Sequence, residues 1–355
     1  MDNYKKVQEI ISRLELEAAL ISNGNNMRYV SGYAGETGYL YISGSRRAVI
    51  TDSRYTIQAE LEAEGYEVIT IGNNGYEEAI NDILKSERVN RLGFEAEDLL
   101  YAKYQNLKDK VRVDELIPIK DEITRLRRIK SPKELEYIRR AEEIGDNVFT
   151  DILDFIKPGM TELEVAARIE YLLKLYGAQR VSFPAIIASG IHSSMPHAVP
   201  TTKKIENGDF LTMDFGCVYE GYCSDMTRTV VIGKASDKQK EIYNLVLEAQ
   251  TAALDVIRAG LKGKEVDKAA RDIIYGAGYE GCFGHGLGHS VGLFIHENPR
   301  LSPLEEDFLE AGMIETVEPG IYVKGFGGVR IEDLVAVTET GCDNFTHSEK
   351  KLIEL

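Results

Sequence analysis

Four acidic residues fall into two pairs, and each pair flanks a segment that reads as a β-hairpin. Asp214 and Asp225 lie on either side of one predicted turn, and Glu318 and Glu332 are symmetric about Gly325. In a regular antiparallel ladder, directly opposed residues have Cβ atoms about 4.5–5.5 Å apart. Two carboxylates at that separation repel each other, and burial would raise the pKa of one until it lost its charge. A cation between them removes the conflict, so each pair is a candidate metal site.

A histidine-rich segment separates the two hairpins. His285, His289 and His296 fall within twelve residues of a chain that has six histidines. Four carboxylates with one neutral imidazole form an oxygen-rich donor set, which favours Mn²⁺, Co²⁺, Fe²⁺ or Zn²⁺ over a metal held by thiolates. These donors are too many for one tetrahedral ion and suit two ions that share carboxylates.

Each of these features has an ordinary alternative. An acidic pair in a hairpin is more often a surface feature, and a single histidine is more often a hydrogen-bonded residue of the core. A glycine-rich phosphate loop is the alternative for the Gly-His-Gly sequence, but no Lys-Ser/Thr follows it and the chain is acidic. The coincidence of two matched hairpins with one histidine-rich segment favours the metal site.

The elements that must position these residues form a repeated pattern in residues 124–355. Ser131, Thr161 and Ser236 each begin an S/T-x-x-E/Q signature, which is typical of a helix N-terminus. The spacing predicts helices over residues 132–156, 162–177, 237–260 and 266–275. Each pair of helices is followed by apolar segments that are broken by glycine turns. We predict two diverged helix–helix–hairpin copies with pseudo-twofold symmetry and a site between them.

Residues 1–123 alternate short apolar runs with helical patterns, which predicts a separate α/β domain. A charged segment at residues 118–130 reads as a linker, so we place the domain boundary between residues 123 and 124. The fold class is therefore α+β, with an α/β domain at 1–123 and the repeated unit at 124–355. The candidate strands are 18–21, 38–42, 47–51, 67–71 and 91–94, and the candidate helices are 5–13, 54–64 and 77–85.

Composition restricts the partners and the compartment. The net charge of −16 follows from 42 basic and 58 acidic residues, and it argues against nucleic acid or an anionic membrane as a partner. No secretory signal is visible, and no run of apolar residues is long enough to span a bilayer. The four cysteines form no CxxC pair and are too few for a disulfide framework. We expect a reduced, cytoplasmic protein.

At these same residues the sequence resembles the pita-bread metallopeptidases, which include methionine aminopeptidase, Xaa-Pro aminopeptidase and Xaa-Pro dipeptidase. The resemblance covers residues 124–355 and rests on the segments MDFG (213–216), CSDMTRT (223–229), GHGLGH (284–289), VEPGIY (317–322) and GVRIED (328–333). It implies a pita-bread fold and five metal ligands, which are Asp214, Asp225, His289, Glu318 and Glu332.

The resemblance also implies roles for further residues. His197, in SMPH (194–197), and His296 match the active-site histidines of the family. They would bind the substrate and stabilise the oxyanion, while Glu318 would move the proton from the attacking water to the proline nitrogen. His285 matches a substrate-contacting histidine of the proline-directed members. Arg330 matches an arginine beside the last ligand, either as a substrate contact or as support for a ligand carboxylate.

The N-terminal segments NMRYVSGYAG (26–35) and TDSRY (51–55) resemble the creatinase-type domain of Xaa-Pro aminopeptidases. The function implied is a dinuclear aminopeptidase that removes the residue preceding a proline in second position. An Xaa-Pro dipeptidase (prolidase) is the alternative, and a metal-free creatinase-like hydrolase and an inactive binding module are remote ones. The resemblance further implies two divalent ions, preferably Mn²⁺, a proline-containing peptide as substrate, and a homodimer. Glu315 departs from the family pattern, and we expect it to point away from the site.

Overall fold

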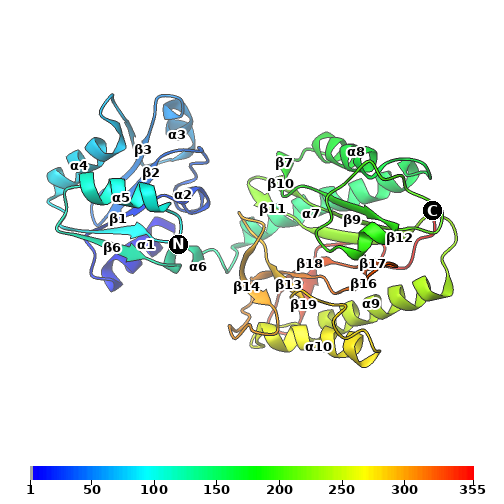
Figure 1. Ribbon diagram of the computed structural model, residues 1–355. Helices are drawn as coiled ribbons and strands as arrows, with labels where there is room; N and C mark the ends of the chain where they lie inside the picture. Colours follow the sequence, from blue (N-terminus) through cyan, green and yellow to red (C-terminus); the bar gives the residue numbers. More distant parts are fainter. Residues whose placement is uncertain (1–2) are drawn as a thin grey trace. The chain divides into compact units, whose positions relative to one another are not determined.

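The computed structural model describes residues 3–355 and contains two compact units (Figure 1). One unit extends from the N-terminus to Arg127, and the other covers Arg128–Leu355. The predicted boundary between residues 123 and 124 falls inside a short helix, α6 (Glu122–Arg125). Among the residues described, no helix is both long enough and apolar enough to cross a membrane.

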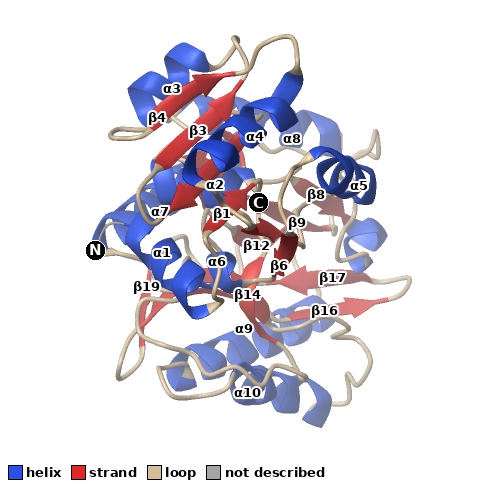
Figure 2. Cartoon of the chain, turned by 90° about the vertical axis from the view of Figure 1, so that its left-hand side faces the viewer, coloured by secondary structure: helices blue, strands red, loops and turns tan. Residues whose placement is uncertain are grey.

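The first unit is built on one six-stranded sheet with the order β4-β3-β2-β1-β5-β6. Figure 2 shows β4 and β3 side by side at one edge of this sheet. Its strands are β1 (Ala18–Ile21), β2 (Tyr39–Ser43), β3 (Arg47–Thr51), β4 (Glu67–Thr70), β5 (Arg91–Glu95) and β6 (Glu115–Ile119). Its other helices are α1 (Asn3–Arg13), α2 (Gly24–Ser31), α3 (Thr56–Glu62), α4 (Gly75–Glu87) and α5 (Tyr101–Lys110). Apolar residues of the central strands pack against α4 and α5 to form the core.

The sequence patterns missed β6, α2, α5 and α6 in this unit. Pro118 interrupts the β6 pattern, and the strand tolerates it because β6 is an edge of the sheet. Gly24 and two asparagines are poor helix formers, so α2 has a weak helical signal. The helix is fixed by its ends instead: the Asn23 side chain accepts a hydrogen bond from the Asn26 backbone, and Gly32 ends the helix with a φ of 87°.

The second unit contains the four predicted helices. They are α7 (Pro132–Phe155), α8 (Glu162–Leu175), α9 (Asp237–Val256) and α10 (Gly263–Gly276), and a 3-10 turn, η1 (Gly190–Ser194), lies within the first half. The capping boxes predicted at Ser131, Thr161 and Ser236 are confirmed, because in each the cap side chain and the third helical residue exchange hydrogen bonds with the backbone. These reciprocal bonds explain why the first residues of these helices could be predicted from the sequence.

The strands of the second unit form small antiparallel sheets. The orders are β12-β9-β8, β11-β10-β7, β14-β13-β15-β18-β19 and β16-β17. The first half contributes β7 (Arg180–Val181), β8 (Ile186–Ser189), β9 (Phe210–Phe215), β10 (Cys217–Tyr219), β11 (Tyr222–Cys223) and β12 (Met226–Val231). The second half contributes β13 (Gly288–Ser290), β14 (Glu297–Leu301), β15 (Ile314–Val317), β16 (Gly320–Val323), β17 (Gly327–Arg330), β18 (Asp333–Val337) and β19 (Cys342–Asn344).

Two hydrophobic cores hold the second unit together. One core joins α7 and α8 to β8, β9 and β12, and the other joins α9 and α10 to β15, β16, β17 and β18. In Figure 1, α8 lies above the strands of this unit and α9 and α10 lie below them. The predicted repeat of two helices followed by a hairpin is therefore confirmed. Each copy has a core, and the core of the second copy also includes Phe210 and Val231 from β9 and β12.

The hairpin of the second copy has the register that the sequence predicted. Strands β15 and β18 pair Val317 with Asp333. The next residues toward the turn, Glu318 and Glu332, therefore lie level with each other across the two strands. Strands β16 and β17 continue the same register beyond them.

The hairpin of the first copy has a different register from the predicted one. Asp214 pairs with Thr227 rather than with Asp225, so the prediction that the two aspartates directly oppose each other was wrong. The loop consists of Glu220 and Gly221, with φ of 47° and 82°, which is the two-residue turn preferred in hairpins. Asp214 and Asp225 are diagonal neighbours on one face of the ladder, still within reach of each other.

Gly216 separates β9 from β10, where the chain crosses close to the opposite strand. A Cβ atom at this position would lie 1.9 Å from the backbone oxygen of Ser224. Gly216→Ala is expected to lower the free energy of unfolding by about 1–3 kcal/mol, because the backbone must shift to admit the methyl group. Urea unfolding measures the loss. Gly145→Ala in α7 is the matched control, since a Cβ there meets no atom within 4 Å and should be neutral or stabilising.

Candidate metal centre and substrate cavity

A cavity of about 400 Å³ lies within the second unit. All nine site residues predicted from the sequence line it. They are His197, Asp214, Asp225, His285, His289, His296, Glu318, Arg330 and Glu332. Other lining residues include Phe183, Ile186, Ile295 and Arg300. The cavity therefore combines a cluster of acids, several imidazoles, an apolar wall and two cationic side chains.

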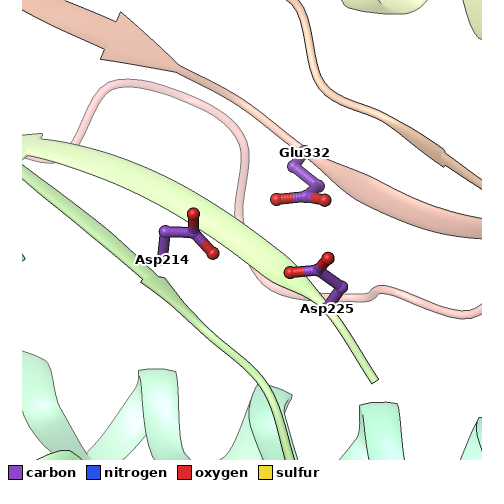
Figure 3. A group of neighbouring side chains, drawn as sticks. All are labelled: Asp214, Asp225 and Glu332. Atoms are coloured by element: carbon purple, nitrogen blue, oxygen red, sulfur yellow. The ribbon is translucent and has the colours of Figure 1, made fainter. Parts of the chain in front are cut away.

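Three carboxylates converge at the centre of this cavity. Asp214 comes from the end of β9, Asp225 from the link between β11 and β12, and Glu332 from the link between β17 and β18. One oxygen from each side chain lies within 4.8 Å of the others, and all three residues are buried. Figure 3 shows the three carboxylates facing one another across a common space. The two halves of the unit thus meet at their acidic residues.

His289 and Glu318 complete the cluster. The Nε2 atom of His289 lies 3.5 Å from Asp225 Oδ2 and 3.5 Å from Glu318 Oε1. The Nδ1 atom lies 3.2 Å from the Ser290 carbonyl, which can only accept, so Nδ1 carries the proton and Nε2 presents a lone pair. Burial, followed by the nearby His296, lowers the pKa of His289 to about 3, so the ring is neutral. A neutral imidazole among carboxylates is a typical metal ligand.

The surroundings of these carboxylates disfavour their charged forms and so raise their pKa values. Burial, and next the charges of Glu332 and Asp214, raise the pKa of Asp225 well above its ordinary value. Burial and the neighbouring acids likewise raise the pKa of Glu332, and burial raises that of Glu318 to about 7. Within residues 3–355, Asp214 Oδ1 and Glu332 Oε1 are buried without any hydrogen-bond partner.

Divalent cations fit this donor set. Each of the two unpartnered oxygens faces a cluster of like charge, and a cation would satisfy both the missing contact and the repulsion. The 3.5 Å distances around His289 are too long for hydrogen bonds, yet they allow one ion to contact both partners at ligand distances of about 2.0–2.2 Å. Five donors again suit two ions better than one.

Arg330 supports the cluster instead of facing open space. Its Nη2 donates to Asp214 Oδ2 at 2.5 Å, its Nε donates to the Thr227 hydroxyl at 3.0 Å, and its Nη1 donates to the Tyr322 hydroxyl at 2.8 Å. The Thr227 hydroxyl in turn donates to Glu332 Oε2 at 2.6 Å. The guanidinium is therefore committed to orienting ligand carboxylates, which leaves it less able to bind substrate directly.

Sequence reasoning missed three hydroxyl residues that orient the acids. Thr227 binds Glu332, and Thr316 donates to Glu318 Oε1 at 3.0 Å. Tyr322 joins Arg330 to His285, whose Nε2 lies 3.0 Å from the tyrosine hydroxyl. Thr227 and Tyr322 stand within the segments that carried the resemblance, and Thr316 lies two residues before Glu318. Residues two or four positions apart lie on the same face of a strand, so the spacing of these hydroxyl residues from Asp225 and Glu318 could have identified them.

The three other histidines of the cavity differ in what they can still bind. His285 is engaged at both ring nitrogens, because Nδ1 binds the Gly286 carbonyl and Nε2 faces Tyr322. Burial lowers the pKa of His285 to about 4, so it stays neutral. His296 is partly exposed, with its ring centroid 4.6 Å from that of His289, and His197 is exposed to the cavity. His197 and His296 remain available to a substrate.

Glu315 lies outside the cavity, on the opposite face of β15 from the cluster. It is fully buried, and neither of its oxygens finds a hydrogen-bond partner among the residues described. Burial raises the pKa of Glu315 well above its ordinary value. This residue points away from the site, as expected from the sequence.

Comparisons with known proteins identify the family of each unit. The family model "Metallopeptidase family M24" matches residues 136–339, and "Creatinase/Prolidase N-terminal domain" matches residues 4–129. The chain is 40% identical over 354 residues to an Xaa-Pro dipeptidase of Pyrococcus horikoshii, with 99% of both chains covered.

Two solved structures are similar over nearly the whole chain. The Xaa-Pro dipeptidase from Bacillus anthracis superimposes with a TM-score of 0.97 at 42% identity, covering 100% of this chain and 99% of that one. The X-Pro aminopeptidase from Thermotoga maritima MSB8 superimposes with a TM-score of 0.91 at 37% identity, covering 97% of this chain and 99% of that one.

Proposed function

Because the chain belongs to metallopeptidase family M24 and carries a creatinase/prolidase N-terminal domain, we propose that it is an Xaa-Pro dipeptidase. The observation that carries the proposal is a single cavity that joins the acid and histidine cluster to a separate cation, Arg300. The N-terminal sequence segments favoured an Xaa-Pro aminopeptidase. The similarity to Xaa-Pro dipeptidases across the whole chain supports the dipeptidase better.

The metal centre consists of Asp214, Asp225, His289, Glu318 and Glu332 in this proposal. They would hold two divalent ions, with Mn²⁺ as the preferred metal. Ions at this place supply a water of lowered pKa and a Lewis acid for the scissile carbonyl. We also propose that the protein is a homodimer.

Glu318 is the residue that transfers the proton in this proposal. Its side chain is 16% exposed and lines the cavity, so it can reach both the attacking water and the leaving nitrogen. The proline nitrogen of an Xaa-Pro bond is a tertiary amide with no N–H, so it must receive a proton before it can leave. Glu318 would take that proton from the attacking water and deliver it to the nitrogen.

His197, His296 and the apolar wall of the cavity position the peptide in this proposal. Both histidines lie at the exposed side of the cluster and can donate to the oxygen that gains charge during attack. Phe183, Ile186 and Ile295 offer apolar surface for the proline ring. His285 and Arg330 act through Tyr322 and Asp214, as their hydrogen bonds indicate.

Arg300 distinguishes a dipeptide from a longer substrate. A dipeptide ends in a carboxylate directly after the proline, and a nearby guanidinium would bind it. Arg300 lines the cavity, and no ion pair or hydrogen bond of its guanidinium is found among residues 3–355. Arg300→Gln is expected to lower kcat/KM for Ala-Pro by about 10–100-fold, mostly through KM, since a charge-assisted bond is worth about 1.5–3 kcal/mol. Ala-Pro-amide, which lacks the carboxylate, should be hydrolysed equally by both proteins.

The aminopeptidase is the second candidate, and the likeness to the X-Pro aminopeptidase from Thermotoga maritima favours it. The deciding comparison is the wild-type kcat/KM for Ala-Pro against that for Ala-Pro-Ala. Faster hydrolysis of the dipeptide supports the proposal. Faster hydrolysis of the tripeptide, with no effect of Arg300→Gln, would replace it by the aminopeptidase.

A further inference from the structure

A buried carboxylate outside the cavity binds both ends of the loop that carries His197. Glu162, the first residue of α8, is fully buried. Its Oε1 accepts from the backbone N and hydroxyl of Ser189, at 2.7 and 2.9 Å, and its Oε2 accepts from those of Thr201, at 3.0 and 2.8 Å. His192 Nδ1 lies 2.9 Å from each oxygen. One side chain thus fixes three points of residues 189–201.

This segment has the form of a compact loop whose ends meet at Glu162. Residues 189–201 match the length of an Ω-loop, in which chain ends lie close together. Pro196 and His197 project from its middle to line the cavity. Hydrogen bonds to the neighbouring hairpin hold that middle part: the Gly328 backbone N donates to Ser193 Oγ at 2.8 Å, and Arg330 donates to the Pro196 carbonyl at 3.3 Å.

Apolar packing contributes little to the position of the loop. Ile191, Met195 and Val199 are exposed by 63%, 49% and 73%, so its largest apolar side chains are mostly outside the core. A segment with few buried apolar contacts opens easily unless polar contacts hold it. The bonds to Glu162 therefore carry much of what keeps His197 in place.

Glu162 makes these bonds as a charged acceptor. Burial alone would raise its pKa, but the hydrogen bonds from His192, Ser189 and Thr201 outweigh burial and lower the pKa below the ordinary value. A carboxylate can only accept, so His192 Nδ1 carries a proton toward it. Hydrogen bonds to an ionised acceptor are about twice as strong as those between neutral groups.

We propose that Glu162 is a positioning residue that holds His197 at the metal centre through the loop of residues 189–201. The predicted effect of Glu162 on catalysis rests on the proposed peptidase function. Glu162 itself touches neither the cavity nor the cluster. Its effect on the reaction passes entirely through the loop and His197.

The decisive variant is Glu162→Gln, which keeps the size of the side chain but replaces an acceptor oxygen by a donor. It is expected to lower kcat/KM for Ala-Pro by about 100-fold, because a displacement of a catalytic group such as His197 by about 1 Å can cause a loss of this size. The amount of bound Mn²⁺ should equal that of the wild type. In a His197→Ala background, Glu162→Gln should lower kcat/KM by less than about 3-fold, because groups that act as one unit are not additive.

Glu164→Gln is the matched control for the variant. Glu164 lies in the same first turn of α8 and closes the capping box with Thr161, but it has no contact with the loop. This control should lose a little stability and keep the wild-type kcat/KM. Equal losses in both variants, or full additivity of Glu162→Gln with His197→Ala, would show that Glu162 serves only the fold.

Hydrogen exchange separates the positioning role from the proposed peptidase activity. Peptides that cover residues 189–201 should exchange faster in Glu162→Gln than in the wild type or in Glu164→Gln. Unchanged exchange overturns the inference, whereas faster exchange in a protein that cleaves neither Ala-Pro nor Ala-Pro-Ala overturns only the peptidase assignment. If Glu162→Gln does not fold, Thr201→Val removes one hydroxyl bond, and a loss of about 10-fold with the same non-additivity is expected.

Discussion

Replacing Asp225 by asparagine is expected to lower kcat for Ala-Pro by about 1,000-fold or more, because without a complete metal centre no activated water is available. Asparagine preserves the shape of the side chain and removes the charge that a divalent cation requires. Asp225 is buried between Glu332 and Asp214 and lies beside His289. Initial rates and elemental analysis after dialysis against Mn²⁺ measure the two effects, and bound metal should fall below the wild-type amount.

The same variant should be more stable than the wild type when metal is absent. Burial and the charges of Glu332 and Asp214 disfavour the ionised form of Asp225, so the fold gains when that charge is removed. Urea unfolding in the presence of EDTA should therefore give a higher midpoint for Asp225→Asn. Loss of activity with a gain of metal-free stability distinguishes a ligand from a structural carboxylate.

Glu315→Gln is the control for this prediction. Glu315 is a buried acid of the same unit with a raised pKa, but it lies outside the cavity. Its substitution should leave both metal content and kcat close to wild type. An Asp225→Asn protein that retains full activity and full metal would contradict the proposed ligand set.

Metal binding is expected to raise the melting temperature by about 10 °C for each ion bound. A ligand at 1,000 times its Kd stabilises a protein by about 4 kcal/mol per site, and each kcal/mol is worth about 2–4 °C in a unit of this size. Scanning calorimetry with EDTA and with excess Mn²⁺ measures the shift. Equal melting temperatures under both conditions would contradict a built metal centre.

The metal-free protein should lose stability as pH rises from about 4.5 to about 7. Glu318 titrates at about 7 in the fold, against an ordinary value of 4.5, so the folded state binds the extra proton in this window. Stability falls with pH wherever the folded state holds more protons than the unfolded chain. Cations compete with those protons, so the stabilisation by Mn²⁺ should be larger at pH 7 than at pH 5.

The sequence was most informative where one local rule decides the structure. The family resemblance and the fold class are confirmed, and the helix starts at Ser131, Thr161 and Ser236 follow from reciprocal side-chain bonds. The level positions of Glu318 and Glu332 follow from a hairpin that keeps one register throughout. The roles of the site residues stay predictions, although one cavity contains all nine.

The sequence was less informative where a shift of one residue, or a distant partner, decides the structure. The turn falls at Glu220 and Gly221, so the cross-strand partner of Asp214 is Thr227, two positions beyond the predicted partner Asp225. The hydrogen bonds that join Tyr322 to Arg330 and His285 connect residues up to 37 positions apart, so no local sequence pattern predicts them. Strand β6 was hidden by a proline that only an edge strand tolerates.

The two separate cores of the catalytic unit have a consequence for how the protein matures. The core of α7 and α8 supports Asp214 and Asp225, whereas the core of α9 and α10 supports His289, Glu318 and Glu332. A nascent chain that has completed only the first half offers two carboxylates and no imidazole from this set. In the proposed centre, cation binding would therefore follow the docking of both halves. The ion would add to the hydrogen bonds that already join them, such as those from Thr227 to Glu332 and from Arg228 to Asp333.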